Sequence, residues 1–360
     1  MSQIKISVII PVYNAQEYLE ECIQSLVNQT LQECEFLFIN DGSIDKSQEI
    51  IERFQENDKR IKLINQNNKG RSLARNAVLD IAVGTYIGFI DSDDYMEKDM
   101  LEVLYNEAIE TKTDIVISGT FLGRDDKFIT KKPVFPTNII YEQDFIQKDI
   151  ISNLLEREDL FAVWNKIYRK DLLQSHKIKF PNTYDEDQFF NILAFNNAKT
   201  VVFSDYCGYF YREVKFGVSK NILEVDYFKI ALSKLKYDYK REYNLSLFSS
   251  SEVEKLKSIR FIQKVYYLFF IYSISKLSIQ KTIASLKEMV LHPEVNKVST
   301  IYNKEIIKNQ GIYETLLSKV IRNKSIIGIY SLFFIVKLFY SPMFSETARF
   351  INKKILLKTN

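Results

Sequence analysis

The chain has 360 residues, of which 46% are hydrophobic and 26% are charged. These values are ordinary for a globular protein and exclude a disordered or fibrous chain, and the length allows a buried core in one large or two ordinary domains. Three cysteines without a short repeated spacing predict neither a disulfide framework nor a CxxC metal site, so we expect a reducing, cytoplasmic setting. Two histidines leave little room for zinc catalysis or a Ser-His-Asp triad, so catalysis must rest on carboxylates.

The net charge of +3 conceals an uneven distribution along the chain. Residues 1–225 hold 26 Lys and Arg against 36 Asp and Glu, whereas residues 226–360 hold 23 against 10. The two parts are therefore expected to meet different partners. The nearest approach to a membrane span, residues 325–336, is shorter than the roughly 18 apolar residues that a plain span needs, so we do not expect an integral membrane protein.

Short apolar runs alternate with amphipathic segments from the N-terminus onward. The pattern predicts strands at 6–10, 35–39, 61–64 and 86–90, and helices at 19–27, 50–54 and 72–81. Such alternation predicts a parallel sheet covered by helices, with ligands bound outside the carboxyl ends of the strands. Asn14 and Glu17 predict a capping box at the start of the first helix.

The pattern becomes less regular after the fourth strand. A helix is predicted at 96–109 and a strand at 115–118, whereas residues 119–155 show little periodicity. A newly patterned stretch begins at 164–169, and beyond about residue 225 the chain is lysine-rich and typical of helices.

Each of the four predicted strands ends in small or polar residues. These segments are 11–14 (Pro-Val-Tyr-Asn), 41–43 (Asp-Gly-Ser), 68–70 (Asn-Lys-Gly) and 91–94 (Asp-Ser-Asp-Asp). Tyr offers a flat face for a base, Asp can accept a hydrogen bond from a base N–H, and Gly lets the backbone approach a ligand. Each segment alone is also typical of an ordinary turn, but the four together meet at one edge of the sheet, where ligands bind.

Asp91 and Asp93 are the most specific of these features. In an extended segment, residues i and i+2 point the same way, so these two carboxylates can meet one hard cation. Mn²⁺ or Mg²⁺ binds few protein carboxylates and completes its shell with phosphate oxygens and water, which matches two aspartates plus a diphosphate. The alternative is a solvated acidic turn, which the buried strand before Asp91 disfavours.

The order of these motifs resembles glycosyltransferase family 2 with the GT-A fold. The resemblance is strong over residues 4–110 and fair to about residue 220, and it does not extend further. It implies an α/β chain whose GT-A, Rossmann-like domain, residues 1–225, contains a mostly parallel sheet. The implied parts are a nucleotide-binding half at 1–110, an acceptor half at 111–225 and a basic, mainly helical region at 226–360.

The resemblance implies a donor site along the strand ends. By this resemblance, Tyr13 and Asp41 would hold the nucleotide base. Asp91 would meet the ribose side and would also bind the Mn²⁺ or Mg²⁺ cofactor, of which Asp93 would be the principal ligand. Arg75 would lie beside the nucleotide. The other matching donor positions are Pro11, Gly70 and Ser92.

Glu186 and Asp187, with Phe190 three positions further on, are similar to the ED motif of the family. The resemblance implies that Asp187 is the general base. Alone, an acidic pair at the start of an apolar helix more often complements the helix dipole. The upstream metal motif favours catalysis, because breaking a sugar–phosphate bond requires a base for the acceptor and a cation for the diphosphate. Lys166, Arg212 and Glu186 are candidates for the acceptor or phosphate side.

Together with the resemblance, these features predict an inverting glycosyltransferase. It would move a sugar from a nucleotide sugar, taken to be a UDP-sugar, to a hydroxyl of a saccharide or lipid-linked glycan. A composition rich in Ile, Lys and Asn suits bacterial surface polysaccharide assembly. A nucleotidyltransferase that makes sugar nucleotides would instead show a glycine-rich phosphate loop after the first strand. A non-enzymatic membrane- or nucleic-acid-binding protein would leave the strand-end motifs unexplained, and we expect no nucleic-acid partner.

Two apolar stretches, residues 265–272 and 325–336, occur in the basic part of the chain. The second is flanked by Lys319, Arg322, Lys324, Lys353, Lys354 and Lys358. Aromatic and basic residues together suit an anionic membrane surface, which predicts a peripheral protein at the inner face of the plasma membrane. The alternative is that both stretches are buried, against each other or against a second subunit of a homo-oligomer.

Overall fold

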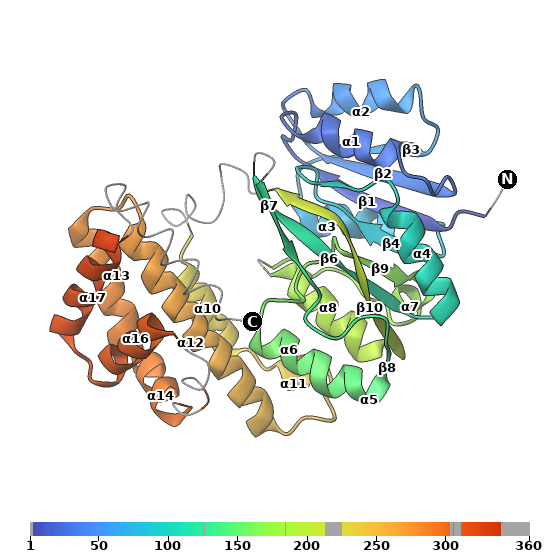
Figure 1. Cartoon of the computed structure of the whole chain (residues 1–360). Coiled ribbons are helices and arrows are strands. Elements are labelled where there is room, and N and C mark those ends of the chain that lie inside the picture. Colours follow the sequence, from blue (N-terminus) through green and yellow to red (C-terminus); the bar gives the residue numbers. More distant parts are fainter. Residues whose placement is uncertain are drawn as a thin grey trace. The chain divides into compact units, whose positions relative to one another are not determined.

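The computed structural model describes residues 3–124, 127–183, 185–212, 225–302, 305 and 311–339. The chain divides into two compact units, residues 1–215 and 216–360 (Figure 1). Tyr184, which precedes the predicted acidic motif, lies outside the described residues, as do Lys353, Lys354 and Lys358.

The first unit is built on a ten-stranded sheet (Figure 1). Its strands are β1 (Ile6–Val12), β2 (Cys34–Asp41), β3 (Ile61–Gln66), β4 (Tyr86–Phe89), β5 (Tyr95–Met96), β6 (Ile115–Arg124), β7 (Lys127–Lys131), β8 (Ile140–Glu142), β9 (Lys166–Arg169) and β10 (Thr200–Arg212). They follow the order β3-β2-β1-β4-β9-β6-β10-β5, with β7 beside β6 and β8 beside β10. The first four strands in this order are parallel, and beyond β4 the pairings run in both directions. The α/β class predicted from the alternating pattern is confirmed.

Helices cover both faces of the parallel part. The helices of this unit are α1 (Leu19–Val27), α2 (Ser47–Gln55), α3 (Arg71–Leu79), α4 (Met100–Thr111), α5 (Gln143–Phe145), α6 (Ile151–Glu156), α7 (Lys170–Ser175) and α8 (Glu186–Asn197), with a π-helical turn at Ile146–Ile150. Ile6, Val8 and Ile10 point to one face of β1, where a single apolar core joins them to α1, α2 and α4. α3 lies on the opposite face (Figure 1). Because β1 is covered on both faces, it is apolar throughout and not alternating.

Two local predictions were wrong. α1 begins at Leu19 without a side-chain cap, so Asn14 does not cap it. Asn14 instead has a φ of 50°, in the left-handed region that asparagine tolerates, and its side chain bonds to another loop. The helix predicted at 96–109 starts later, as α4, because β5 comes first and pairs with β10.

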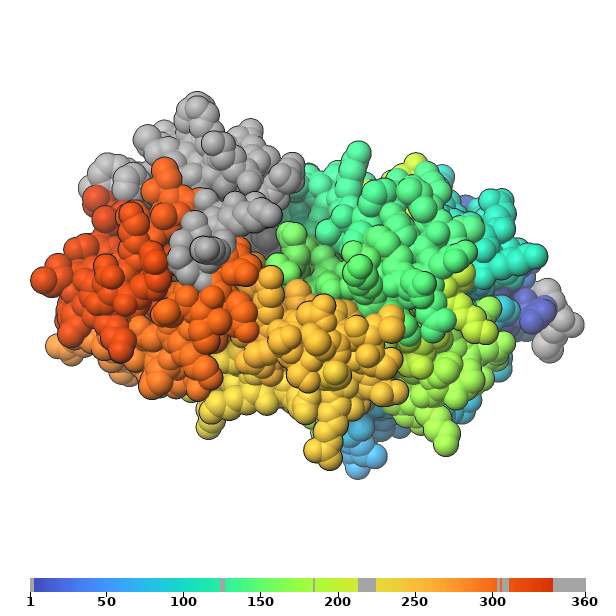
Figure 2. Space-filling model, turned by 90° about the horizontal axis from the view of Figure 1, so that it is seen from below, coloured from blue at the N-terminus to red at the C-terminus, as the bar shows by residue number. Residues whose placement is uncertain are grey.

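The second unit is helical, as predicted. Its described helices are α10 (Tyr227–Lys236), α11 (Tyr239–Glu242), α12 (Ser250–Ile274), α13 (Ile279–Leu291), α14 (Pro293–Ile301), α16 (Ile312–Arg322) and α17 (Ile326–Phe339). All of them except α11 contribute to one hydrophobic core, and in Figure 2 the yellow to red residues of this unit pack closely against one another. Most of residues 265–272 lie in that core, with Val265 and Leu268 fully buried and Tyr267 42% exposed, so this stretch packs mainly against the rest of the unit. Among the helices that the structure describes, none is long and apolar enough to span a membrane.

Candidate functional site

The loops after β1 and β2 are fastened to each other. Asn14 donates its backbone N–H to Oγ of Ser43 at 3.1 Å, and its side-chain Oδ1 accepts from the N–H of Ile44 at 2.9 Å. Tyr13, beside this contact, is 53% exposed, so its ring is available to a ligand. Pro11 lies at the base of the same loop, near the end of β1. The structure thus places both predicted residues at the carboxyl edge of the sheet.

The loop between β3 and α3 closes over Asp41 at the end of β2. Oδ1 of Asp41 accepts from the N–H of Lys69 at 2.9 Å, and Oδ2 accepts from the N–H of Gly70 at 2.8 Å. Gly70 has a φ of 85°, a left-handed conformation that favours glycine, and it directly precedes α3. Asp41 therefore shapes the loop that brings Gly70 to the N-terminus of α3.

A hollow of about 510 Å³ lies at the ends of β2 and β3. Its lining includes five carboxamide side chains, those of Asn40, Gln48, Asn65, Gln66 and Asn67. Carboxamides both donate and accept hydrogen bonds, so the hollow suits a polar ligand with hydroxyl groups or base edges. Sequence reasoning missed these residues, because single Asn and Gln side chains carry no motif of their own.

The acidic turn after β4 is tied to β10 by Asp94. Asp94 is 1% exposed, and its N–H donates to the carbonyl of Asp91 at 3.0 Å, which closes the turn. Its carboxylate accepts from the hydroxyl of Tyr209 at 2.7 Å and from the N–H of Arg212 at 2.9 Å. Asp94 is therefore occupied by protein partners, and the sequence did not reveal this role because both partners lie more than a hundred residues further along the chain.

Asp91 and Asp93 remain as the predicted metal ligands, with Ser92 between them in the half-buried turn. Burial and the neighbouring charge of Asp91 raise the pKa of Asp93 to about 6. A divalent cation would neutralise such a crowded pair, and oxygen donors of this kind suit Mg²⁺ or Mn²⁺. Within the described ranges, no three His, Cys, Asp or Glu side chains gather as a metal site.

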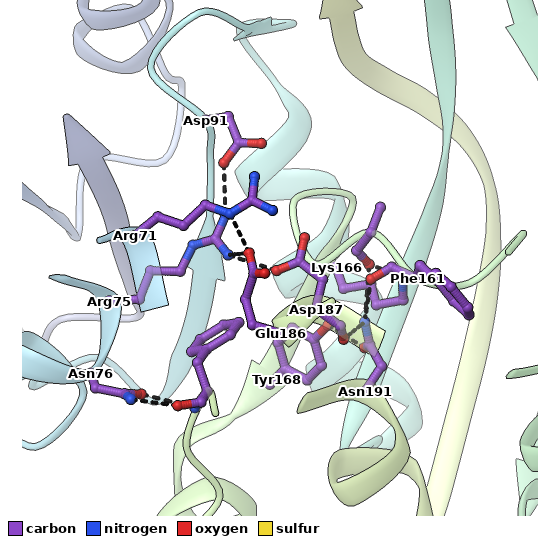
Figure 3. A network of polar contacts seen from close by, with 12 residues as sticks. Arg71, Arg75, Asn76, Asp91, Phe161, Lys166, Tyr168, Glu186, Asp187 and Asn191 are labelled. Atoms are coloured by element: carbon purple, nitrogen blue, oxygen red, sulfur yellow. Dashed lines mark hydrogen bonds and ion pairs between the residues drawn. The ribbon is translucent and has the colours of Figure 1, made fainter. Parts of the chain in front are cut away.

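Arg75 on α3 joins the acidic turn to the predicted base (Figure 3). Its Nη2 donates to Oδ1 of Asp91 at 2.8 Å, and its Nη1 donates to Oδ1 of Asp187 at 2.6 Å. Its guanidinium also lies over the ring of Phe180, 5.0 Å from the centroid. Sequence reasoning placed Arg75 beside the nucleotide. The structure shows it 0% exposed behind the two carboxylates, so it can act on a ligand only through them.

Glu186 and Arg71 complete this network, as Figure 3 shows. Oε1 of Glu186 accepts from Nε of Arg71 and lies 3.5 Å from Nη1 of Arg75. The side chain of Glu186 is 2% exposed, whereas that of Asp187 is 21% exposed. Of the two acidic residues at the start of α8, Asp187 is therefore the one that a ligand can reach, and Glu186 holds the arginines.

Burying these charges together changes their acidity. Burial and the charge of Asp187 raise the pKa of Glu186 to about 7. Burial also raises the pKa of Asp187, against the opposing effect of Arg75. For Arg75, burial lowers the pKa, but the three surrounding carboxylates outweigh burial and raise it, so the guanidinium stays charged. A carboxylate with a raised pKa is a stronger base near neutral pH than an ordinary one.

Asn191 anchors α8 beside the predicted base. Its Oδ1 accepts from the hydroxyl of Tyr168 at 2.7 Å. Its Nδ2 donates to the carbonyl of Phe161 at 2.7 Å and to that of Asp187 at 3.0 Å. Sequence reasoning missed Asn191, although its position four residues after Asp187 puts both on one face of the helix.

Lys166 fastens the loop before β9. Its Nζ donates to the carbonyl of Leu160 at 3.3 Å, to the carbonyl of Ala162, and to Oδ1 of Asn165 at 3.0 Å. Burial lowers the pKa of Lys166 to about 7, against the opposing charge of Asp187. The ammonium therefore contacts protein oxygens and not an open surface. The structure shows these contacts in place of the predicted phosphate contact.

Arg212 lies at the end of β10, against the acidic turn. Its Nε donates to the carbonyl of Asp93 at 3.0 Å, and its Nη2 donates to Oε2 of Glu21 at 2.5 Å. The guanidinium also lies over the rings of Tyr18 and Tyr95, 5.0 and 5.1 Å from their centroids. Its place next to the turn is consistent with the phosphate side of a donor site, and that role stays a prediction.

Known proteins share both the motifs and the fold. The family model Glycosyl transferase family 2 matches residues 7–176. The uncharacterized glycosyltransferase EpsJ of Bacillus subtilis (strain 168) is 36% identical over 210 residues, which cover 58% of this chain and 61% of EpsJ. A cholesterol galactosyltransferase of Borreliella burgdorferi is 32% identical over 284 residues, which cover 75% of this chain and 76% of that protein.

A solved structure shows the same fold. S. aureus TarS 1-349 in complex with UDP-GlcNAc has a TM-score of 0.59 and 23% identity, with 93% of this chain and 91% of that one covered. The matched part of EpsJ amounts to about three-fifths of its length.

Proposed function

Since this chain belongs to glycosyl transferase family 2 and is a glycosyltransferase, we propose that it transfers a sugar from a UDP-sugar to a hydroxyl of a saccharide or lipid-linked glycan, with inversion. The UDP-GlcNAc complex of TarS, which shares the fold, supports a uridine donor. The relative named a cholesterol galactosyltransferase supports transfer of a hexose. The composition supports a role in bacterial surface polysaccharide assembly.

The observation that carries this proposal is the guanidinium shared by Asp91 and Asp187. Arg75 bonds to both, so the end of β4 and the start of α8 meet at one point. Sugar transfer needs a cation for the leaving diphosphate and a base for the acceptor at opposite sides of one bond. The contact through Arg75 brings candidates for both tasks together.

Asp187 takes the proton of the acceptor hydroxyl while the acceptor oxygen attacks C1 of the donor sugar. The bond from C1 to the diphosphate oxygen breaks, its electrons leave with UDP, and attack from the opposite side inverts the configuration. Arg75 fixes the orientation of the Asp187 carboxylate during this step. An Mg²⁺ or Mn²⁺ ion held by Asp93 and Asp91 would stabilise the negative charge of the leaving diphosphate.

The donor is proposed to lie along the strand ends. Its base sits between Tyr13 and Asp41, with Pro11 and Gly70 at the edges of the same loops. Its ribose lies at the acidic turn beside Ser92. The exposed ring of Tyr13 and the fastened loops support this arrangement, because a site that is formed before binding loses less entropy when the ligand arrives.

A screen of sugar nucleotides tests the proposal. The chain is incubated with each nucleotide sugar in Mn²⁺, Mg²⁺ or EDTA, and both nucleotide release and melting temperature are measured. We expect at least one UDP-sugar to raise the melting temperature and to be hydrolysed only with metal. Formation of a sugar nucleotide from a nucleoside triphosphate and a sugar phosphate would instead establish the nucleotidyltransferase alternative.

A further inference from the structure

The helix α17 is apolar on two opposite faces. The face packed into the core of the second unit carries Ile329, Leu332, Phe333 and Val336. The opposite face carries Ile327, Tyr330, Phe334, Ile335 and Leu338, which are 80, 38, 53, 47 and 56% exposed. A helix that is hydrophobic all round is normally covered all round, by protein or by lipid. The exposed face of α17 therefore calls for a partner.

The exposed side chains form one stripe. With 3.6 residues per turn, Ile327, Phe334 and Leu338 point within about 40° of one another. Tyr330 and Ile335 lie at the two edges of the stripe. A contiguous apolar surface of this kind marks an interaction site, in contrast to the scattered apolar residues of an ordinary surface.

Positive charges accompany the stripe. Residues 312–339, which span α16, the following turn and α17, hold Lys319, Arg322, Lys324 and Lys337 against a single acidic residue, Glu314. Nζ of Lys337 lies 5.3 Å from the ring of Phe333, and Nζ of Lys287, on α13, lies 5.0 Å from the ring of Tyr330. An apolar stripe with a cationic rim matches a surface that is apolar below and anionic above, as an acidic lipid bilayer is.

We propose that the exposed face of α17 docks this chain on an anionic membrane surface, with the helix lying in the plane of the membrane. The 14 residues of α17 extend for about 21 Å, short of the roughly 30 Å of a hydrocarbon core, so the helix lies in the interface and does not cross it. A nucleic acid would satisfy the cations but leave the stripe uncovered. A second copy would bring like charges together, since residues 226–360 hold 23 basic and 10 acidic residues.

Vesicle flotation of the full chain tests this docking. Wild-type protein should float with phosphatidylcholine vesicles that contain phosphatidylglycerol, and should bind much less to pure phosphatidylcholine. The triple variant Ile327→Gln/Phe334→Gln/Leu338→Gln should lose about tenfold or more of its partitioning, because it removes three inserted apolar side chains. Substitution is preferable to truncation here, because Leu317 and Ile321 of α16 belong to the buried core.

A matched control separates docking from general loss of apolar surface. Leu247 and Ile301, in the same unit, are 60 and 59% exposed, and Leu247→Gln/Ile301→Gln should bind vesicles like the wild type. The variant Arg322→Gln/Lys324→Gln should bind anionic vesicles several-fold less, with reduced dependence on salt. Circular dichroism and melting temperature are measured on every variant to confirm folding.

Three outcomes would overturn the proposal. Wild-type flotation of a folded triple variant would show that the stripe does not insert. A wild-type dimer that ignores vesicles and becomes monomeric in the triple variant would show that a second copy covers the stripe. If the full chain does not bind vesicles but a variant that lacks residues 340–360 does, that segment covers the stripe.

Discussion

The two units of the chain bury different kinds of side chain. In the first unit, charged groups such as Arg75, Lys166 and Glu186 are almost fully buried. In the described part of the second, the buried polar residues are hydroxyl-bearing except for Arg260. Buried charge costs stability unless it is well paired, so its concentration marks a functional site. The contrast places the candidate chemistry in the first unit.

The largest expected effect comes from the acidic turn of the first unit. A loss of activity there would be the strongest support for placing the chemistry in this unit. Asp93→Asn removes the charge of the proposed metal ligand at the rim of the sheet, so turnover should fall to background while the fold is retained. Asp91→Asn should be nearly as damaging. The control Asp80→Asn, at a site 67% exposed and paired with Lys179, should keep full activity. Wild-type turnover of Asp93→Asn at saturating Mn²⁺, with unchanged metal dependence, would show that the assignment is wrong.

Removal of Arg75 should affect both stability and rate, because this buried charge of the first unit contacts the proposed base. Arg75→Met leaves three carboxylates without their buried partner, which should lower the free energy of unfolding by about 3–5 kcal/mol. It should also lower kcat by about a hundredfold through misplacement of Asp187. Arg75→Lys should restore part of the stability but little of the rate, because one ammonium cannot replace the two Nη donors. Denaturant unfolding and kcat are measured on both, and a normal kcat in Arg75→Lys would argue against a positioning role.

Lys166 should give a moderate effect confined to the acceptor. Lys166→Met releases the carbonyls of Leu160 and Ala162, which it holds in the loop before β9. We expect the acceptor KM to rise several-fold while the Kd for the donor stays within about twofold. Calorimetric titration measures the Kd for the donor, and kinetics at varied acceptor concentration measure the acceptor KM. An equal loss of donor binding would indicate a general structural role.

A separate effect, which does not involve turnover, is expected on the pH dependence of stability. Because the pKa of Glu186 is raised from 4.5 to about 7, the folded state binds more protons than the unfolded state between these pH values. The free energy of unfolding of the metal-free protein should therefore carry a component that falls as pH rises through this window. Glu186→Gln removes that component. Denaturant unfolding at pH 5 and pH 7.5 measures it, and an identical pH dependence in both proteins would contradict the assignment.

The position of the residues proposed for the donor side could be predicted from the sequence because their motifs are local. Asp41 ends β2, Asp91 and Asp93 follow β4, and the strand order places them at one edge of the sheet. The burial of Arg75 could not be predicted, because its partner Asp187 lies 112 residues further along the chain and meets it only when α8 and α3 come together. The role of Asp94 could not be predicted for the same reason, because its partners come from β10.

The second unit shows the same limit for apolar patterns. Residues 265–272 and 325–336 look alike in sequence, with aromatic and aliphatic residues in a basic setting. Most of the first stretch lies in the core, whereas α17 buries one face and exposes the other. Hydropathy measures how apolar a helix is and not how many neighbours surround it, so only the packing separates the two.

The most direct test of the account is the kinetics of Asp187→Asn. The amide keeps the shape of the carboxylate but cannot take the proton of the acceptor, so kcat should fall by about 10²–10⁴. The Kd for the donor should change little, because a general base acts in the transition state and contributes little to donor binding. A folded Asp187→Asn enzyme with near-normal kcat would contradict the central claim that this carboxylate, held by Arg75, is the base of the transfer.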